Sequence, residues 1–366
     1  MKNVHDRRLQ QLRDEMRKQD IDCVAICNSP NLFYMTGYAP KKDERFHTAF
    51  IPREGEPILA VPALYQMDSQ VHCSIQTQRV WMDGINMVEY VRGIVSELGV
   101  VGGRIAIDDA FEFRSFDLIR QVAGNAAFTL GSALFTELRM RKSPEEIALM
   151  QLSGKLSDDA MQAMMERVTG GESEAQLKTW IEYDLSSKGM RDGFSNLIAF
   201  GRNTASVHHT SGDTVAKKGD ALYFDLGGAY NKYWSDITRS FHIGPPSERY
   251  VTAYNRVREA QQLAFEAIKP GVRACDVHMV AYAYLEKHGL AEYFLHRLGH
   301  GMGLEGHELP NLSMDCEIEL EPGMTFSCEP GVYFSGEFGI RIEDTVCVTE
   351  TGAVSFNLFT KDLLVL

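Results

Sequence analysis

The chain has 366 residues, 44% hydrophobic and 24% charged, a composition typical of a folded globular protein. Its formal net charge of −13 argues against nucleic acid or an anionic membrane surface as a partner, because both attract basic patches. The seven cysteines are odd in number and scattered through apolar runs, so we expect reduced thiols rather than a disulfide framework.

The length and the N-terminal segment of the chain indicate how many domains it has and where it is located. A chain of 366 residues exceeds the size at which one core usually keeps growing, so two domains are expected. The first 16 residues are charged and lack the apolar core of a signal peptide. The sequence has no run of about 18 apolar residues that could span a membrane, and we therefore expect a cytoplasmic protein.

The first 130 or so residues alternate between helical and strand patterns. Residues 6–19 have apolar side chains at helical spacing, and residues 22–27 form a short apolar run typical of a buried strand. Residues 47–63 indicate a hairpin that turns at Glu54 and Gly55. This alternation predicts an α/β domain with a mixed sheet, which we assign to residues 1–135.

A strong helix start marks the second domain. Ser143 can cap a helix that has Pro144 at its first position, and Glu146 can complete a capping box. The pattern predicts a boundary within residues 136–143 and a long helix over 144–167. We assign residues 140–366 to the second domain.

The second domain contains a weak internal repeat. Residues 168–190 and 268–290 each open with a glycine-containing turn, continue as a helix and close with glycine and an apolar residue. A helix precedes each copy, at 144–167 and at about 248–267, and strand-like sequence with histidines follows. Two such copies predict a pseudo-symmetric α+β domain with a site between its halves. A chance match of two amphipathic helices is the alternative.

Two aspartates lie in a predicted hairpin with Asn231 and Lys232 at its tip. A two-residue turn there places Asp225 opposite Thr238, two positions from Asp236. Side chains alternate between the faces of a strand, so both carboxylates would point to one face, about 7 Å apart at the backbone. Aspartate is unfavourable inside strands, which favours a functional role over a turn role.

Further polar side chains follow in glycine-rich or strand-like sequence. His300 lies in the stretch LGHGMG, whose glycines let the backbone approach a ligand closely, and His307 follows seven residues later. Glu329 comes at a strand end, and Glu343 stands among strand formers, where a buried glutamate needs a partner or a metal. Arg341 would face the same side as Glu343 and could pair with a carboxylate.

These residues form the donor set of a metal centre. Four carboxylates and one imidazole suit Mn²⁺, Co²⁺, Fe²⁺ or Zn²⁺, and two such ions can share a bridging water. The sequence therefore predicts a hydrolytic centre with two cations, whose ligands are Asp225, Asp236, His300, Glu329 and Glu343.

The motifs around these residues resemble those of a known family. The segments from GRNTASVHH to GIRIEDTVCVTETG are similar to the catalytic domain of the pita-bread metallopeptidases, specifically the branch of Xaa-Pro dipeptidases and aminopeptidases P. NSPNLFYMTGY at 28–38 is similar to the signature of the small N-terminal domain that this branch shares with creatinase. The resemblance implies a homodimer of α+β fold, with a pita-bread catalytic domain and two Mn²⁺ or Co²⁺ ions; Zn²⁺ and Fe²⁺ are the alternatives.

The resemblance also implies a role for each ligand. Asp225 would bind one metal in bidentate fashion, and His300 and Glu329 would bind the other. Asp236 and Glu343 would bridge the two metals.

The implied reaction is hydrolysis of the Xaa-Pro bond at the N-terminus of small peptides. Glu329 would act as general base for the attacking water, since it lies beside that water. His208 and His307 would contact the substrate and stabilise the intermediate, and Arg341 would order the region.

The proline pocket is less defined by the motifs. Phe194 and Tyr233 match positions that often wall this pocket, although a core position explains both as well. His209, beside His208, is an uncertain second candidate.

Two positions depart from the family pattern. Asn311 follows the HELP motif where many dipeptidases have an arginine that holds the product-end carboxylate, which favours longer substrates. Gly306 replaces a branched apolar residue and would open the pocket wall.

Two other functions remain open. A metal-dependent lyase or amidohydrolase of a small metabolite could use the same scaffold, and the two departures favour it. A binding protein without turnover is the other, but such relatives usually lose metal ligands and this chain keeps all five.

Overall fold

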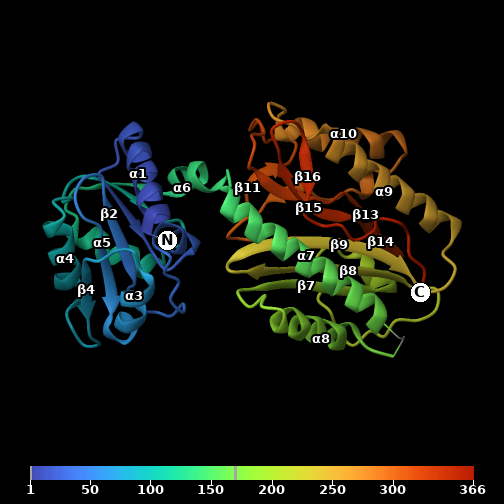
Figure 1. The fold of residues 1–366 in the computed structure, drawn as a ribbon, viewed down its shortest axis with the longest axis horizontal. Helices are drawn as coiled ribbons and strands as arrows, with labels where there is room; N and C mark the ends of the chain where they lie inside the picture. The colour runs from blue at the N-terminus through green and yellow to red at the C-terminus, as the bar shows by residue number, and fades with distance from the viewer. Residues whose placement is uncertain (1, 169–170) are drawn as a thin grey trace. The chain divides into compact units, whose positions relative to one another are not determined.

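The computed structural model describes residues 2–168 and 171–366 and divides the chain into two compact units (Figure 1). One ends at Arg139 and the other begins at Met140, within the segment 136–143 that the helix start indicated. Among the described residues, no helix combines the length and the apolar character that a membrane span requires.

The first unit is an α/β domain. Its elements are α1 (Lys2–Lys18), β1 (Cys23–Ile26), α2 (Pro30–Thr36), β2 (Thr48–Pro52), β3 (Ile58–Pro62), the short 3₁₀ helix η1 (Ala63–Tyr65), α3 (Gln66–His72), β4 (Gln78–Trp81), α4 (Met87–Glu97), β5 (Arg104–Ile107), α5 (Phe113–Val122), β6 (Ala127–Leu130) and α6 (Ser132–Arg139).

The predicted mixed sheet is confirmed in this unit. Its order is β4-β3-β2-β1-β5-β6, with antiparallel pairs from β1 to β3 and parallel pairs elsewhere. The predicted hairpin is the pair β2 and β3, and the strand predicted at 22–27 is β1. The first helix begins at Lys2, earlier than the predicted 6–19.

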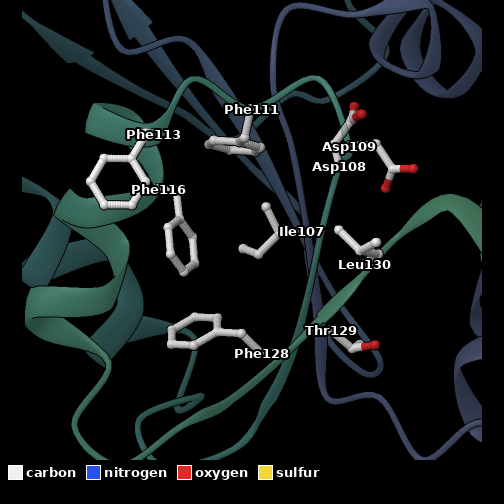
Figure 2. Close-up of a pocket in the computed structure, with 9 residues that line it drawn as sticks. All are labelled: Ile107, Asp108, Asp109, Phe111, Phe113, Phe116, Phe128, Thr129 and Leu130. Atoms are coloured by element: carbon white, nitrogen blue, oxygen red, sulfur yellow. The ribbon is translucent and has the colours of Figure 1, made fainter.

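An aromatic cavity of about 430 Å³ lies at the β6 end of this sheet. In Figure 2 the rings of Phe113, Phe116 and Phe128 face a common space beside Ile107. Its charged lining residues are two aspartates, Asp108 and Asp109, so it does not have the donor set of a metal centre.

The second unit carries the candidate site. Its elements are α7 (Pro144–Arg167), α8 (Glu174–Ser187), β7 (Phe194–Phe200), η2 (Gly201–Ala205), β8 (Ala221–Tyr230), β9 (Tyr233–His242), α9 (Glu248–Ala267), α10 (Ala274–Lys287), η3 (Ala291–Tyr293), β10 (Gly299–Gly301), β11 (Glu308–Leu312), β12 (Thr325–Cys328), β13 (Gly331–Phe334), β14 (Phe338–Arg341), β15 (Glu343–Val348) and β16 (Ala353–Ser355).

The capping box at the start of α7 is confirmed. The backbone N–H of Glu146 donates to Ser143 Oγ, and the backbone N–H of Ser143 donates to Glu146 Oε2 at 2.7 Å. The hydroxyl of Tyr233 donates to the other oxygen of Glu146 at 2.7 Å, which ties the start of β9 to the start of this helix.

The internal repeat is present as two helix pairs. α8 and α10 each have 14 residues and start at Glu174 and Ala274, and each follows a long helix. Residues 169 and 170 of the first copy lie outside the described part of the chain. Side chains of α7 and α8 pack on β7, β8 and β9, whereas those of α9 and α10 pack on β12 and β15. Figure 1 shows each helix pair alongside its own half of the sheet.

The two halves share one eight-stranded sheet, which confirms the predicted α+β class. Its order is β11-β10-β12-β15-β9-β8-β7, with β16 paired to β15, while β13 and β14 form a separate ribbon. The halves meet where β9 pairs with β15, with Glu343 opposite Thr238. A site near this junction can therefore combine side chains from both halves.

Candidate metal centre

The β8–β9 hairpin has the predicted register. Asp225 is paired with Thr238, and Gly227 with Asp236. Asn231 and Lys232 form the tip with φ angles of 47° and 72°, the left-handed values that a tight hairpin turn requires. Asp225 and Asp236 therefore lie on one face, opposite the face of Phe224 that packs in the core.

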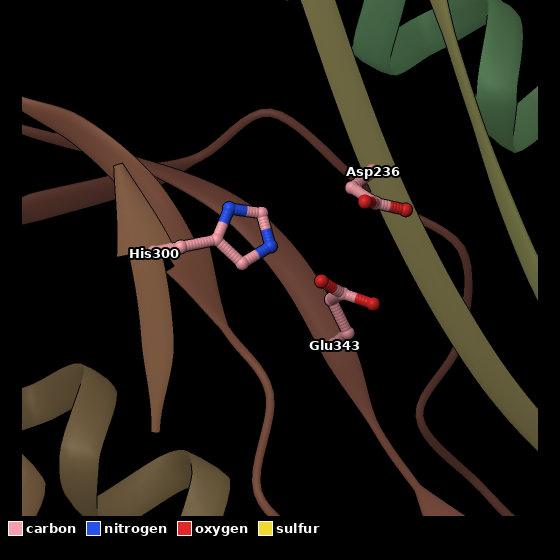
Figure 3. Close-up of side chains that lie close together, drawn as sticks. All are labelled: Asp236, His300 and Glu343. Carbon is pink, nitrogen blue, oxygen red and sulfur yellow. The ribbon is translucent and has the colours of Figure 1, made fainter. Parts of the chain in front are cut away.

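The second half supplies the other three donors. His300 is the central residue of β10, Glu329 follows β12, and Glu343 begins β15. Gly299 is required beside His300, because a β-carbon there would lie 1.9 Å from the carbonyl oxygen of Ser327. Figure 3 shows Asp236, His300 and Glu343 directed toward one another, and one ligand atom of each lies within 4.8 Å of the others.

The imidazole of His300 has the protonation state that a metal ligand needs. Burial lowers its pKa to about 4, so the ring is neutral near pH 7. Its Nδ1 lies 3.2 Å from the carbonyl oxygen of Gly301 and must carry the proton that is donated there. Nε2 then presents a lone pair, 3.3 Å from Glu329 Oε1, which already accepts from the Ser327 hydroxyl. Two acceptors facing each other fit a cation between them.

The carboxylates also fit bound cations. Asp225 Oδ1 and Asp236 Oδ1 are buried and have no hydrogen-bond partner. Burial, followed by repulsion from Glu343 and Asp225, raises the pKa of Asp236 well above its usual range. Burial and repulsion from Glu329 and Asp225 do the same for Glu343. Divalent cations would remove this repulsion, as in oxygen-rich two-metal sites.

Arg341 holds the carboxylates from the side of β14. Its Nη2 pairs with Asp225 Oδ2, and its Nε donates to Thr238 Oγ1 at 3.1 Å. Thr238 in turn donates its hydroxyl to Glu343 at 2.5 Å. Through these contacts one buried guanidinium holds two carboxylates of the candidate centre in place: Asp225 directly, and Glu343 through Thr238.

A cavity of about 430 Å³ opens above these groups. Its lining includes all five expected ligands together with Arg341, His208 and His307. Four further residues line it that the sequence did not single out: Ser195, Val207, His296 and Arg297.

His307 lies against the candidate ligand His300. The two rings are 3.8 Å apart and nearly parallel. Arg297 Nη2 lies 3.2 Å from His307 Nδ1, and since a guanidinium can only donate, Nδ1 accepts and the ring proton is on Nε2. Burial, His300 and Arg297 lower the pKa of His307, so this donor is a neutral imidazole.

His208 and His209 have different surroundings. His208 lines the cavity, whereas His209 Nε2 is 2.8 Å from Glu174 Oε2. Glu174 also accepts from the backbone N–H groups of Phe200 and Gly212, so it orders the segment that carries His208.

Two predicted pocket residues lie elsewhere. In β7, Leu197 is paired with Asp225, so Ser195 shares its face and Phe194 points to the core. In β9, Tyr233 is three positions from Asp236 and therefore faces the opposite side, where it bonds Glu146. Strand parity thus puts Ser195 rather than Phe194 in the cavity, and the register of β7 needed for this argument was not readable from the sequence.

Neither of the two positions that depart from the family pattern lines the cavity, so Gly306 does not open its wall as expected. Gly306 and Asn311 are absent from its lining. A β-carbon at Gly306 would meet only the ring of Trp234, at 3.8 Å, so this glycine borders a tryptophan rather than the metal ligands.

His296 is a cavity residue that sequence reasoning missed. Its Nδ1 is 2.7 Å from the carbonyl oxygen of Arg297, and its Nε2 is 3.0 Å from the hydroxyl of Tyr333. Both nitrogens are therefore engaged. Its position four residues before His300 was the available signal, but a single histidine beside an arginine gave no reason to choose it.

Two family models match the chain. The family model for metallopeptidase family M24 matches residues 148–350, and that for the creatinase/prolidase N-terminal domain matches residues 8–141.

Individual relatives match almost the whole chain. An Xaa-Pro dipeptidase from Pyrococcus furiosus is 31% identical over 360 residues, which cover 98% of this chain and 99% of the relative. An Xaa-Pro dipeptidase from Lactobacillus helveticus is 32% identical over 362 residues, 98% of each chain. The crystal structure of a recombinant prolidase from Thermococcus sibiricus has a TM-score of 0.94 at 30% identity, over 99% of both chains.

Proposed function

The chain belongs to metallopeptidase family M24, and on that premise we propose that this hydrolase cleaves the bond between the first residue and proline in short Xaa-Pro peptides, using two divalent cations. The relatives named as Xaa-Pro dipeptidases support the substrate class.

One observation carries the proposal of a metal centre. The lone pair of His300, the unpartnered oxygens of Asp225 and Asp236, and the mutually repelling carboxylates all face one cavity. His208 and His307 line the same cavity outside the donor set and are available to a substrate.

Cations held by the five donors would polarise the scissile carbonyl and make a nearby water acidic. Glu329, at the cavity wall, would take the proton from the attacking water through Oε2, since Oε1 already accepts from Ser327. The Nε2–H of His307 would donate to the carbonyl oxygen as negative charge develops there. Arg341 would keep Asp225 oriented throughout.

The proposed ions are Mn²⁺ or Co²⁺. Four oxygen donors with one nitrogen suit hard or borderline divalent ions, which also admits Zn²⁺ and Fe²⁺. Activity measured after reloading metal-free protein with each ion in turn would rank them.

The proposed assembly is a homodimer, as in the family that the motifs resemble. Light scattering on the purified chain checks this: a mass near twice 41.1 kDa is expected, and a mass near 41.1 kDa would contradict it.

The function is tested with Ala-Pro and Ala-Pro-Ala, with Mn²⁺ or Co²⁺ and then with EDTA. Cleavage before proline should disappear with EDTA and return with metal. The variant Asp236→Asn should not recover with metal, whereas Asp315→Asn, a change at an aspartate outside the cavity, should behave as wild type. If metal-loaded protein cleaves neither peptide, the proposal fails and the small-metabolite alternative takes its place.

A further inference from the structure

One of the two arginines that line the cavity has no carboxylate partner among the described residues. Of its two arginines, Arg341 is bound to Asp225. Arg297 makes no ion pair with any carboxylate among the described residues, and its side chain bonds only His307 Nδ1. The remaining N–H groups of this guanidinium are free to bind an anion.

The proposed substrate has an anion at a suitable place. A dipeptide Xaa-Pro ends in a carboxylate that belongs to proline itself, one residue or about 3.8 Å of chain beyond the scissile carbonyl. The two proposed cations would balance the four acidic ligands, so Arg297 is the cation of the cavity that is left to receive this carboxylate. Arg297 Nη2 lies 3.2 Å from Nδ1 of His307. His307 is the residue proposed to contact the scissile carbonyl, so Arg297 is close to the place where this carboxylate would lie.

We propose that Arg297 binds the free carboxylate of an Xaa-Pro dipeptide and so makes dipeptides the preferred substrates; this rests on the proposed function. A planar guanidinium can pair with a carboxylate through two parallel hydrogen bonds, which also fixes the direction of the substrate. Arg297 would thereby supply the cation that position 311 lacks, and it would reverse the preference for longer substrates that Asn311 suggested.

A different role for Arg297 must be separated from this one. By donating to His307 Nδ1, Arg297 also keeps the ring proton of His307 on Nε2. Loss of that contact would slow every substrate alike, whereas loss of a carboxylate anchor would slow only substrates with a free carboxylate after proline.

The test compares Ala-Pro with Ala-Pro-NH₂, which have the same scissile bond and differ in the terminal charge. Wild type should prefer the acid. In Arg297→Gln the ratio of kcat/KM for acid to amide should fall about ten- to a hundredfold, mostly through a higher KM for the acid, as expected for one charge-assisted contact. Arg297→Lys should retain part of the ratio because it keeps the charge.

Arg258→Gln is the matched control, since Arg258 is an exposed arginine of α9 that pairs with Asp362 outside the cavity. Its acid-to-amide ratio should equal that of wild type. An unchanged ratio in Arg297→Gln, or an equal loss on both substrates, would overturn the assignment.

A binding measurement separates failure of this inference from failure of the proposed function. L-proline and L-prolinamide are titrated into metal-loaded wild type and Arg297→Gln by calorimetry, which needs no turnover. Tighter binding of proline in wild type alone supports the carboxylate anchor, even if neither peptide is cleaved. Equal binding of the two ligands in wild type, or a preference for proline that survives in Arg297→Gln, places the carboxylate elsewhere and rejects it.

Discussion

Neutral imidazoles decide the chemistry at the scale of single residues. His300 and His307 both have lowered pKa values, so each offers one lone pair and one N–H near pH 7. Neighbouring groups decide which nitrogen holds the proton: the carbonyl of Gly301 for His300, and the guanidinium of Arg297 for His307. The first ring is thus suited to be a metal ligand and the second a hydrogen-bond donor.

Removal of the donor should slow catalysis without loss of metal. His307→Phe keeps the ring stacked on His300 but has no N–H, so kcat should fall about a hundred- to a thousandfold. Steady-state kinetics and metal analysis of the same sample check this. His288→Phe, on a histidine outside the cavity, should change neither quantity. Unchanged turnover in His307→Phe would remove the oxyanion role.

A buried histidine of the first unit should make stability depend on pH. Burial lowers the pKa of His47 from 6.5 to about 4, so the unfolded chain binds its proton more readily than the folded chain. Stability is therefore lost as the pH falls from about 6.5 towards 4. By about pH 5 the loss should reach about 2 kcal/mol relative to pH 7.

Urea unfolding at both pH values checks this contribution. His47→Phe keeps a ring between Tyr38 and Tyr65 but cannot titrate, so its pH-dependent loss should be smaller by that amount. Equal losses in the variant and in wild type would show that other groups account for the effect.

Single residues were predictable from the sequence where chemistry required them. Carboxylates inside strand sequence and a histidine among glycines indicated the five candidate ligands, which the structure brings to one cavity, because such positions are costly without a role. Arg297 and Ser195 could not be found in this way. Their side chains are ordinary in loops and strands, and only the three-dimensional register brings them to the cavity.

At the scale of elements, α7 approaches its neighbours closely through small residues. Ser153 Oγ donates to the carbonyl of Tyr233, and Ser157 Oγ bonds Ser235 Oγ at 2.8 Å. Gly154 lies against Phe356, with room for no side chain. This contact places α7 on the back of β9, whose other face carries Asp236.

The same substitution in two helices should have opposite effects. In Gly154→Ala the new β-carbon would lie 2.7 Å from the carbonyl oxygen of Phe356, so the free energy of unfolding should fall by about 1–3 kcal/mol. Gly93, in α4, has nothing within 4 Å of such an atom, and Gly93→Ala should raise stability by up to about 1 kcal/mol. Chemical denaturation measures both; the same sign for the two would refute the packing argument.

Elements with local signals were read correctly from the sequence. The capping box at Ser143 and the turn at Asn231 and Lys232 depend on residues close in the chain, and the structure has both. The placement of Phe194 was different, because it depends on how β7 registers against β8. Such pairing is decided by contacts distant in sequence, which local patterns do not contain.

At the scale of the whole molecule, the described residues form two units with separate cores, and the candidate metal centre belongs to the second. Its donors all belong to the second unit, from Asp225 to Glu343. Composition and length predicted the number of units, and the repeat predicted paired helices in the second. The pairing of β9 with β15 required the structure.

Metal should stabilise the second unit alone. A ligand at about a thousand times its dissociation constant adds about 4 kcal/mol, which for a unit of this size raises the melting temperature by roughly 10 °C. Scanning calorimetry with Mn²⁺ and with EDTA should show one transition that moves and one that does not. Asp236→Asn should reduce the shift, and a metal-induced shift of both transitions would mean that the units unfold together.

The junction of β9 and β15 couples metal binding to the pairing of two strands. Thr238 and Glu343 are paired across it, and Asp236 lies next to it, so parting these strands would pull the ligands of the two halves away from each other. Retention of the proposed ions and closure of the strand pair would therefore be one linked equilibrium. Amide hydrogen exchange along the junction should slow as metal is added. The rate of metal dissociation would then report how often these two strands separate.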